Sequence, residues 1–272
     1  MGFNLHMLKF LQSAKQTLEK ELGALKEDFP LGDYIQAPIP SVEPSPFPHI
    51  VVDNLFNEKT YEGLLKHFQS VLDRGFSEQD DPTRFHPFLD LHGDYAYDGY
   101  VYVPRPEEDK ALTLLFSVAW NMLFSKLFGQ PTSWCTTVAY HHHPPGDRTG
   151  FVHHDYATKI FSLNNRLPNG VIFHERDKAP AISQNNVPLL KERRGIALLY
   201  YLGDNAWEQG DGGETGLYLS KGESPVKLIA PKNNRLLAFH ISLKSFHALQ
   251  ETFKPRSSIV QWFHVPAWRE EK

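Results

Sequence analysis

Histidine and aspartate stand two residues apart at two places in the sequence. With 14 histidines among 272 residues, about one such His-x-Asp match is expected by chance, so a lone match is uninformative. His92 and Asp94 lie in a segment rich in glycine and tyrosine, and we assign them no metal. His153 and Asp155 end a segment with the composition of a β-strand. This context selects His153 and Asp155 as the pair that could do chemistry.

The spacing of this pair suits a redox metal. Residues i and i+2 of a strand point to one side, so His153 and Asp155 could bind one ion while His154 points away. Fe(II) that reacts with oxygen is typically held by two neutral imidazoles and one carboxylate, with the other positions open. A third ligand must come from a distant strand, and His247 is the candidate. Taken singly, each residue is more often a buried polar or surface side chain.

The elements that must position these residues change character along the chain. Helical apolar periodicity covers 57–72 and 109–128, and 50–53 has the pattern of a short strand. From residue 133 onward, short strands alternate with clusters of Gly, Asn, Asp and Pro. The expected strands are 136–142, 151–154, 195–202, 215–219, 226–229, 236–241, 247–251 and 256–263. Many short strands after two helices predict a mainly β fold, a sandwich or barrel with flanking helices.

The first 48 residues differ from the rest. Leucines at spacings of three and four predict one amphipathic helix over 4–28. The plainer interpretation is a helix packed on the domain surface, and a homodimer through this helix is the alternative. Residues 30–48 contain six prolines and predict an extended arm rather than a packed element. We therefore divide the chain into an N-terminal helix and arm, 1–48, and one domain, 49–272.

Composition excludes several classes of partner. The net charge is −4 and no long basic block is present, so we expect no nucleic-acid partner. No stretch of about 18 apolar residues occurs, so we expect no membrane association. The single cysteine, Cys135, cannot form an internal disulfide, and no targeting signal is evident. These features favour a cytoplasmic location.

Six segments match one enzyme family in chain order, although no single motif is specific. They are TVAY (137–140), FVHHD (151–155), RGIALLYYLGD (194–204), DGGET (211–215), NRLLAF with FH (234–239 and 246–247) and RSSIVQWFH (256–264). Together they resemble the Fe(II)/2-oxoglutarate-dependent dioxygenases, and within these the prolyl-hydroxylase-like branch. A weaker likeness extends to PHIVVDN at 48–54. The resemblance implies a double-stranded β-helix, a jelly-roll or cupin-like barrel preceded by N-terminal helices.

The resemblance also implies roles for individual residues. His153, Asp155 and His247 would be the Fe(II) ligands. Arg256 would pair with the C5 carboxylate of 2-oxoglutarate, since a guanidinium suits bidentate pairing with a carboxylate.

Three further side chains are expected near the co-substrate or substrate. Ser258, two residues beyond the arginine, and Tyr140 would hydrogen-bond the same C5 carboxylate. Arg148 is a candidate contact for an anionic substrate. The long segment 156–193 is either a substrate lid or a surface excursion. Nucleic-acid demethylases of the superfamily usually carry a second arginine where this chain has Trp262, which we expect in the core.

The expected reaction is hydroxylation of an unactivated C–H bond. Fe(II) would be the cofactor, 2-oxoglutarate and O₂ the co-substrates, and succinate and CO₂ the co-products, with ascorbate as a supporting reductant. A small molecule of amino-acid, sugar or natural-product type is the favoured substrate. The alternatives are a peptidyl, prolyl-type hydroxylase and a non-catalytic barrel that binds a ligand. A cupin-like enzyme that does not use 2-oxoglutarate is disfavoured by Arg256 and Ser258.

Overall fold

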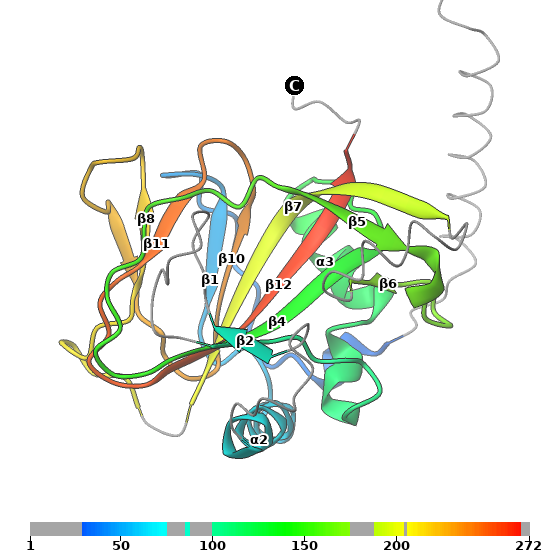
Figure 1. Cartoon of the computed structure of the whole chain (residues 1–272), viewed down its shortest axis with the longest axis horizontal. Coiled ribbons are helices and arrows are strands. Elements are labelled where there is room, and N and C mark those ends of the chain that lie inside the picture. Colours follow the sequence, from blue (N-terminus) through cyan, green and yellow to red (C-terminus); the bar gives the residue numbers. More distant parts are fainter. Residues whose placement is uncertain (1–28, 75–84, 88–99, 175–187, 204–205, 268–272) are drawn as a thin grey trace, which may run out of the picture.

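The computed structural model describes residues 29–74, 85–87, 100–174, 188–203 and 206–267. Strands dominate these residues, and they form two sheets that face each other (Figure 1). Within this part of the chain, no helix combines the length and the apolar character needed to cross a bilayer. The predicted N-terminal helix, and with it the proposed dimer contact, lies outside the described residues.

The larger sheet has nine strands, and its path runs β1-β10-β7-β12-β4-β3-β2. These strands are β1 (His49–Val52), β10 (Arg235–His240), β7 (Leu189–Leu202), β12 (Arg256–Pro266), β4 (Cys135–His143), β3 (Tyr100–Tyr102) and β2 (Phe85–Pro87). Two short strands join it at the side: β5 (Thr158–Ser162) pairs with β7, and β6 (Ile172–Phe173) pairs with β4. The four central strands are antiparallel neighbours, as in one wall of a jelly roll.

The smaller sheet has the order β11-β8-β9, made of β11 (Phe246–Leu249), β8 (Thr215–Tyr218) and β9 (Lys227–Ile229). The expected strand 151–154 is not a full strand. It runs beside β11 through a bridge between His153 and His247 and a bond from the Gly150 amide to the Leu249 carbonyl. With this segment as a fourth strand, two four-stranded walls enclose an apolar interior. The predicted double-stranded β-helix is confirmed.

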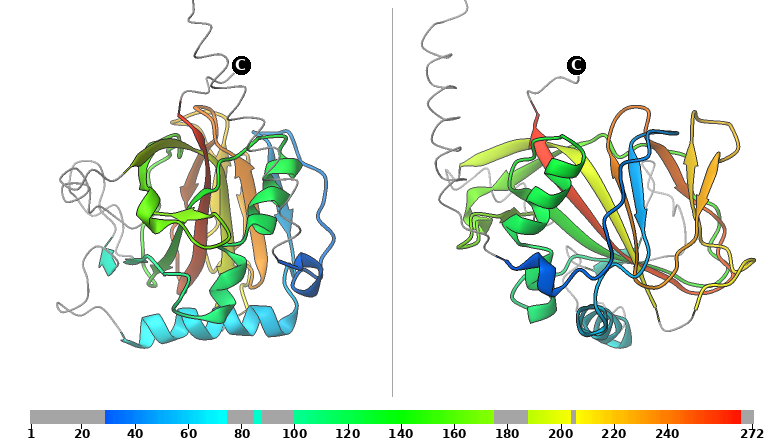
Figure 2. Two further views of the ribbon diagram at one scale, coloured as in Figure 1. Left: turned by 90° about the vertical axis from the view of Figure 1, so that its right-hand side faces the viewer. Right: turned by 180° about the vertical axis from the view of Figure 1, so that it is seen from behind.

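Helices cover the outer face of the larger sheet. In Figure 2, α3 (Val118–Leu127) lies over the back of the sheet and α2 (Glu58–Arg74) runs along its lower edge. The Trp120 ring packs against Phe124, and Phe124 packs against Phe263 of β12. The expected helix 109–128 is two elements, because the Ser117 hydroxyl caps α3 by accepting the Trp120 amide at 3.1 Å. A short 3-10 helix, η2 (Lys110–Leu114), precedes this cap.

Alternation along the central strands decides which side chains reach the interior. On β7, Ala197, Leu199 and Tyr201 join the interior cluster, while the residues between them join the cluster beneath the helices. On β4, Ala139 faces the interior and Tyr140 faces the helices. Interior side chains of the larger sheet are therefore the ones that can meet the smaller sheet.

The proline-rich arm is extended, as expected, but it is also packed. Its single short helical turn is η1 (Leu31–Asp33). Phe47 is only 3% exposed and belongs to the barrel interior, where its ring meets Phe239 edge to face at 5.5 Å. Phe29 contributes to the cluster beneath the helices. The expectation of an unpacked arm was wrong, since prolines forbid helix and ladder bonds but do not prevent neighbouring aromatics from being buried.

Segment 156–193 contributes β5, β6 and the start of β7 to the larger sheet. β5 and β6 extend the larger sheet at the end where β7 begins, and β7 itself starts at Leu189 rather than at residue 195. A short 3-10 helix, η3 (Leu163–Asn165), and a turn lie between β5 and β6, and residues 175–187 lie outside the described part.

Candidate iron centre

The structure brings His153, Asp155 and His247 together inside the barrel. Their ligand atoms lie within 4.8 Å of one another. Nε2 of His153 is 3.8 Å from Oδ1 of Asp155, and Nε2 of His247 is 3.8 Å from Oδ2. The bridge between the 150–155 segment and β11 sets the two histidines side by side, with ring centroids 4.5 Å apart. One ion could therefore contact all three side chains.

Both histidines present Nε2 to the centre of this group. Nδ1 of His153 bonds the Phe151 carbonyl at 3.0 Å, and Nδ1 of His247 bonds the Ser245 carbonyl at 3.0 Å. Because a carbonyl only accepts, each Nδ1 must carry the proton, and each Nε2 keeps its lone pair for a metal. Burial, helped by the neighbouring His153, lowers the pKa of His247 to about 4. His247 is therefore neutral near pH 7, as a metal ligand must be.

The Asp155 carboxylate is held from both sides. Arg194 Nη1 donates to Oδ1 at 3.1 Å, and Trp262 Nε1 donates to Oδ2 at 2.6 Å. Burial raises the pKa of Asp155, but Arg194, the two imidazoles and Trp262 together outweigh burial and hold that pKa well below its usual range. The carboxylate is therefore ionised and fixed in orientation.

Two neutral imidazoles and one ionised carboxylate are the donor set that non-haem Fe(II) takes. All three donors converge from one side, formed by the 150–155 segment and β11, so positions on the other side stay open. The residues present therefore fit a bound Fe(II).

Arg256 lies on the interior face of the barrel, at the beginning of β12. Its Nε donates to the Gly213 carbonyl at 2.8 Å, and Nη2 donates to Thr215 Oγ1 at 3.2 Å. Ser258 lies on the same side, with Oγ 3.5 Å from Nη1, as the strand spacing predicted. The ring of Tyr201 lies beside the guanidinium, 5.1 Å away. A cation ringed by three hydroxyls, with 6% of the arginine exposed, is suited to a carboxylate.

Tyr140 is not part of this group, and the expected hydrogen bond to the co-substrate is wrong. Tyr140 Oη bonds His67 Nδ1 of α2 at 2.8 Å, and the ring stacks on Phe68. The cause is strand alternation: Arg256 pairs with His143 across the β4–β12 ladder, so His143 and His141 share the arginine's face and Tyr140 faces the helices.

Arg148 and the other histidines of the described segments stay outside the triad. The three adjacent histidines of β4 do not share a face, since His142 bonds Ser257 on the helix side. Arg148 is exposed on the loop after β4 and joins neither the triad nor the arginine pocket. His92 and Asp94 lie outside the described residues.

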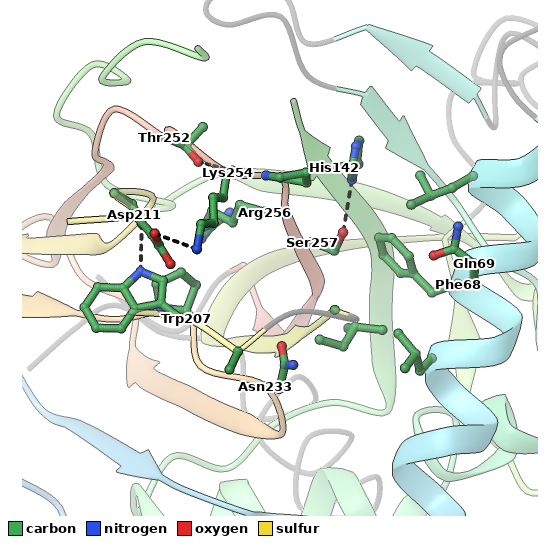
Figure 3. Close-up of a pocket in the computed structure, with 18 residues that line it drawn as sticks. Phe68, Gln69, His142, Trp207, Asp211, Asn233, Thr252, Lys254, Arg256 and Ser257 are labelled. Carbon is green, nitrogen blue, oxygen red and sulfur yellow. Dashed lines mark hydrogen bonds and ion pairs between the residues drawn. The ribbon is translucent and has the colours of Figure 1, made fainter. Parts of the chain in front are cut away.

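A separate cavity of about 330 Å³ lies at the end of the barrel where β12 begins. Figure 3 shows Lys254 and Asp211 on one side of this cavity and Phe68 and Gln69 of α2 on the other. Arg256 contributes to its wall, whereas Asp155 meets β12 at Trp262, further along the strand. The cavity and the triad are thus distinct.

Comparison with known proteins agrees with this geometry. Residues 140–264 match the family model described as the 2OG-Fe(II) oxygenase superfamily. This chain contains a 2OG-Fe(II) oxygenase domain. The oxygenase is a dioxygenase, and its cofactor and co-substrates are Fe(II), 2-oxoglutarate and O₂. Among curated proteins, none matches the chain significantly.

Solved structures share the fold of the oxygenase, among them two prolyl hydroxylases. A prolyl-4-hydroxylase from Pseudomonas putida matches with a TM-score of 0.54 at 14% identity, over 86% of this chain and 95% of that chain. A prolyl hydroxylase from Trichoplax adhaerens, in complex with a peptide fragment of the hypoxia inducible factor oxygen degradation domain, matches with a TM-score of 0.53 at 17% identity, over 79% and 82%. At these identities the likeness concerns the fold.

Sequence reasoning missed four residues of the oxygenase site. Tyr201 and Thr215 join the Arg256 pocket, and the interior face of the YYL segment was the available signal for Tyr201. Trp262 was expected in the core, where it does lie, but its indole also holds Asp155. Arg194 carried no readable signal, because its inward direction depends on an irregularity in β7.

Proposed function

We propose that the oxygenase hydroxylates a side chain of a peptide or protein, with His153, Asp155 and His247 holding Fe(II) and Arg256 binding the C5 carboxylate of 2-oxoglutarate. The observation that carries the proposal is the presence of the triad and the arginine pocket in one barrel interior. This substrate class replaces the small molecule that the sequence favoured.

The co-substrate would lie between the two groups of residues. Arg256 would hold its C5 carboxylate, assisted by the hydroxyls of Ser258, Thr215 and Tyr201. Bound Fe(II) would supply the oxygen chemistry that converts 2-oxoglutarate to succinate and CO₂ and hydroxylates the substrate. The chain's own part is to place a buried cation, Arg256, at the C5 end of the co-substrate and the three ligands that would hold the metal at the other end.

Three observations support a peptide substrate. The oxygenase shares its fold with prolyl hydroxylases, and one of these was solved with a peptide bound. The case for a small molecule depended on a long segment closing the site, and the strands in the described part of that segment join the larger sheet. In addition, Phe151 is 49% exposed, with its ring 4.9 Å from His153, and offers an apolar platform beside the metal position.

The test measures succinate formed from 2-oxoglutarate by the Fe(II)-loaded oxygenase in air. One arm adds a tryptic digest of cell extract, and a second adds the small-molecule fraction of the same extract. We expect the digest to stimulate succinate formation and one or more peptides to gain one oxygen atom by mass spectrometry. His153→Ala and Arg256→Leu should abolish the stimulation. Stimulation by the small-molecule fraction alone would overturn the substrate class, and succinate formation that survives in His153→Ala would overturn the proposed site.

A further inference from the structure

One residue of β7 breaks the alternation of the larger sheet. Ile196 pairs with Phe263 of β12, but His264 pairs with Arg194, so Gly195 is an extra residue opposite no partner. Such a β-bulge turns the following side chain to the other face, and bulges are common next to active sites. Directly paired residues share a face. Arg194 therefore points into the barrel with His264, whereas regular pairing would have pointed it toward the helices.

Glycine is what permits the bulge at this position. A Cβ on residue 195 would stand 2.7 Å from Cγ1 of Val265, closer than carbon atoms approach. The Gly195 carbonyl accepts the amide of Ile241, and the Arg194 amide donates to the Ala157 carbonyl at 3.0 Å. The bulge thus joins β7 to the chain just after Asp155 and is held on both sides.

The inward-turned Arg194 meets the metal-binding carboxylate. Its guanidinium carbon lies 3.9 Å from the centre of the Trp262 ring, and Nη1 donates to Asp155 Oδ1 at 3.1 Å. Its side chain is 16% exposed. Trp262 serves as the platform for the guanidinium and as the donor to the second carboxylate oxygen. Each carboxylate oxygen keeps a lone pair for a metal, while the plane of the carboxylate cannot rotate.

We infer that Arg194 is a positioning residue for the metal site, placed there by the Gly195 bulge. It does not contact the metal position; it acts through Asp155, by fixing the orientation of the carboxylate before the ion arrives. Residues that hydrogen-bond to metal ligands commonly affect metal binding, and their loss typically lowers metal affinity about 10–100-fold. The inference rests on the proposed function, since it requires that the triad hold a metal.

The test titrates the full chain with Mn(II), a redox-stable substitute for Fe(II), and follows the free-ion EPR signal. We expect Arg194→Leu to weaken Mn(II) binding about 10–100-fold. Arg194→Lys should bind more tightly than Arg194→Leu, because an ammonium can still donate to Oδ1 but cannot stack flat on the indole. The EPR line shape of the bound Mn(II), which reports ligand geometry, should differ from wild type in Arg194→Lys.

Two further variants separate positioning from general damage. Gly195→Ala retains the arginine but obstructs the bulge, so we expect it to weaken Mn(II) binding as well. Lys191→Leu removes an exposed cation from the same strand and should leave binding unchanged. Thermal unfolding of every variant confirms that the compared proteins are folded. If Arg194→Leu fails to fold, Arg194→Lys and Gly195→Ala decide the question.

The outcomes distinguish this inference from the proposed function. If the wild-type chain binds Mn(II), His153→Ala loses it, and folded Arg194 and Gly195 variants bind as wild type does, the inference alone is overturned. If His153→Ala binds Mn(II) as tightly as wild type, the proposed metal site fails and the inference fails with it.

Discussion

Two buried tyrosines of the larger sheet have different surroundings, because one lies in the co-substrate pocket and the other beneath the helices. Tyr201 Oη lies 2.6 Å from Thr215 Oγ1, which also accepts from Arg256. Tyr140 is on the opposite face of the sheet and bonds His67 instead. Their hydroxyl groups should therefore have different functions, although both side chains are buried.

Removing these hydroxyls one at a time tests the assignment. We expect Tyr201→Phe to raise the Kd for 2-oxoglutarate about fivefold, since one hydrogen bond near a charged group is worth about 1 kcal/mol. Tyr140→Phe should leave that Kd unchanged and lower the free energy of unfolding by about 1–3 kcal/mol, because the buried Nδ1 of His67 loses its hydrogen-bond partner. Calorimetric titration and urea unfolding measure the two quantities. An equal rise in Kd for Tyr140→Phe would show that the Tyr140 hydroxyl does contact 2-oxoglutarate.

Two interior histidines predict how stability depends on pH in the metal-free protein. Burial lowers the pKa of both His143 and His247 to about 4, against about 6.5 in the unfolded chain. The unfolded chain therefore binds more protons between these values. The stability contributed by the neutral histidines is complete above pH 6.5 and is lost as the pH falls toward 4, by about 1.4 kcal/mol per pH unit for each histidine. Urea unfolding over this range measures it, and a flat profile would contradict the assignment.

Among the elements, the turn before β8 fixes the arginine pocket. Gly212 and Gly213 have φ of 72° and 75°, a region that favours glycine. The Gly213 carbonyl accepts Arg256 Nε, and Gly212 forms a bridge with Thr252 of the neighbouring loop. A Cβ at Gly212 would overlap the carbonyl oxygen of Glu251. The close approach of these two chain segments thus depends on the missing side chain.

A pair of alanine substitutions isolates this effect. Gly210 also has a positive φ, 102°, but a Cβ there would meet nothing within 4 Å. Gly210→Ala should therefore cost only the backbone strain, about 1 kcal/mol. Gly212→Ala should destabilise the protein more and also raise the Kd for 2-oxoglutarate, because the loop that carries the turn must move. Equal effects of the two variants on stability and on Kd would contradict this role of the turn.

The elements also explain which features could be predicted from the sequence. His153 and Asp155 were predictable because residues i and i+2 of an extended segment share a face whatever its register. His247 was predictable only because the order of motifs along the chain resembles that of a known family. Tyr140 was assigned to the wrong face because its face depends on the register between β4 and β12. The three successive histidines that follow it give no alternating pattern from which the inward-facing residues of β4 could be identified. The inward direction of Arg194 could not be predicted for a similar reason, since a bulge depends on how two strands distant in the sequence pair with each other. The break at Ser117 depends on a local hydrogen bond that competes with a continuous helix.

For the whole molecule, the arm and the barrel are connected through the interior. Phe47 packs on Phe239, and Phe239 lies 4.9 Å from the His247 ring. A domain defined as 49–272 leaves out this aromatic. The proposed boundary therefore separates residues that share one apolar cluster.

Substitution of Phe47 measures how much the arm contributes to the stability of the barrel. Phe47→Ala should lower the free energy of unfolding by about 3–5 kcal/mol, as expected for a fully buried phenylalanine. Leu228→Ala, at a site 52% exposed on β9, serves as the control and should change it by less than about 0.5 kcal/mol. A chain beginning at residue 49 should be destabilised like Phe47→Ala. If that shortened chain is as stable as the full protein, the arm is dispensable and the boundary is correct as drawn.

The most direct measurement of the site as a unit is the binding of 2-oxoglutarate by calorimetry, with and without Mn(II). Wild type should bind 2-oxoglutarate tightly only when Mn(II) is present, because the metal and Arg256 hold opposite ends of the same molecule. Arg256→Leu should still bind Mn(II) but lose 2-oxoglutarate, whereas His247→Ala should lose both. Binding of 2-oxoglutarate that does not depend on Mn(II), or that survives unchanged in Arg256→Leu, would contradict a site built from the triad and the arginine pocket.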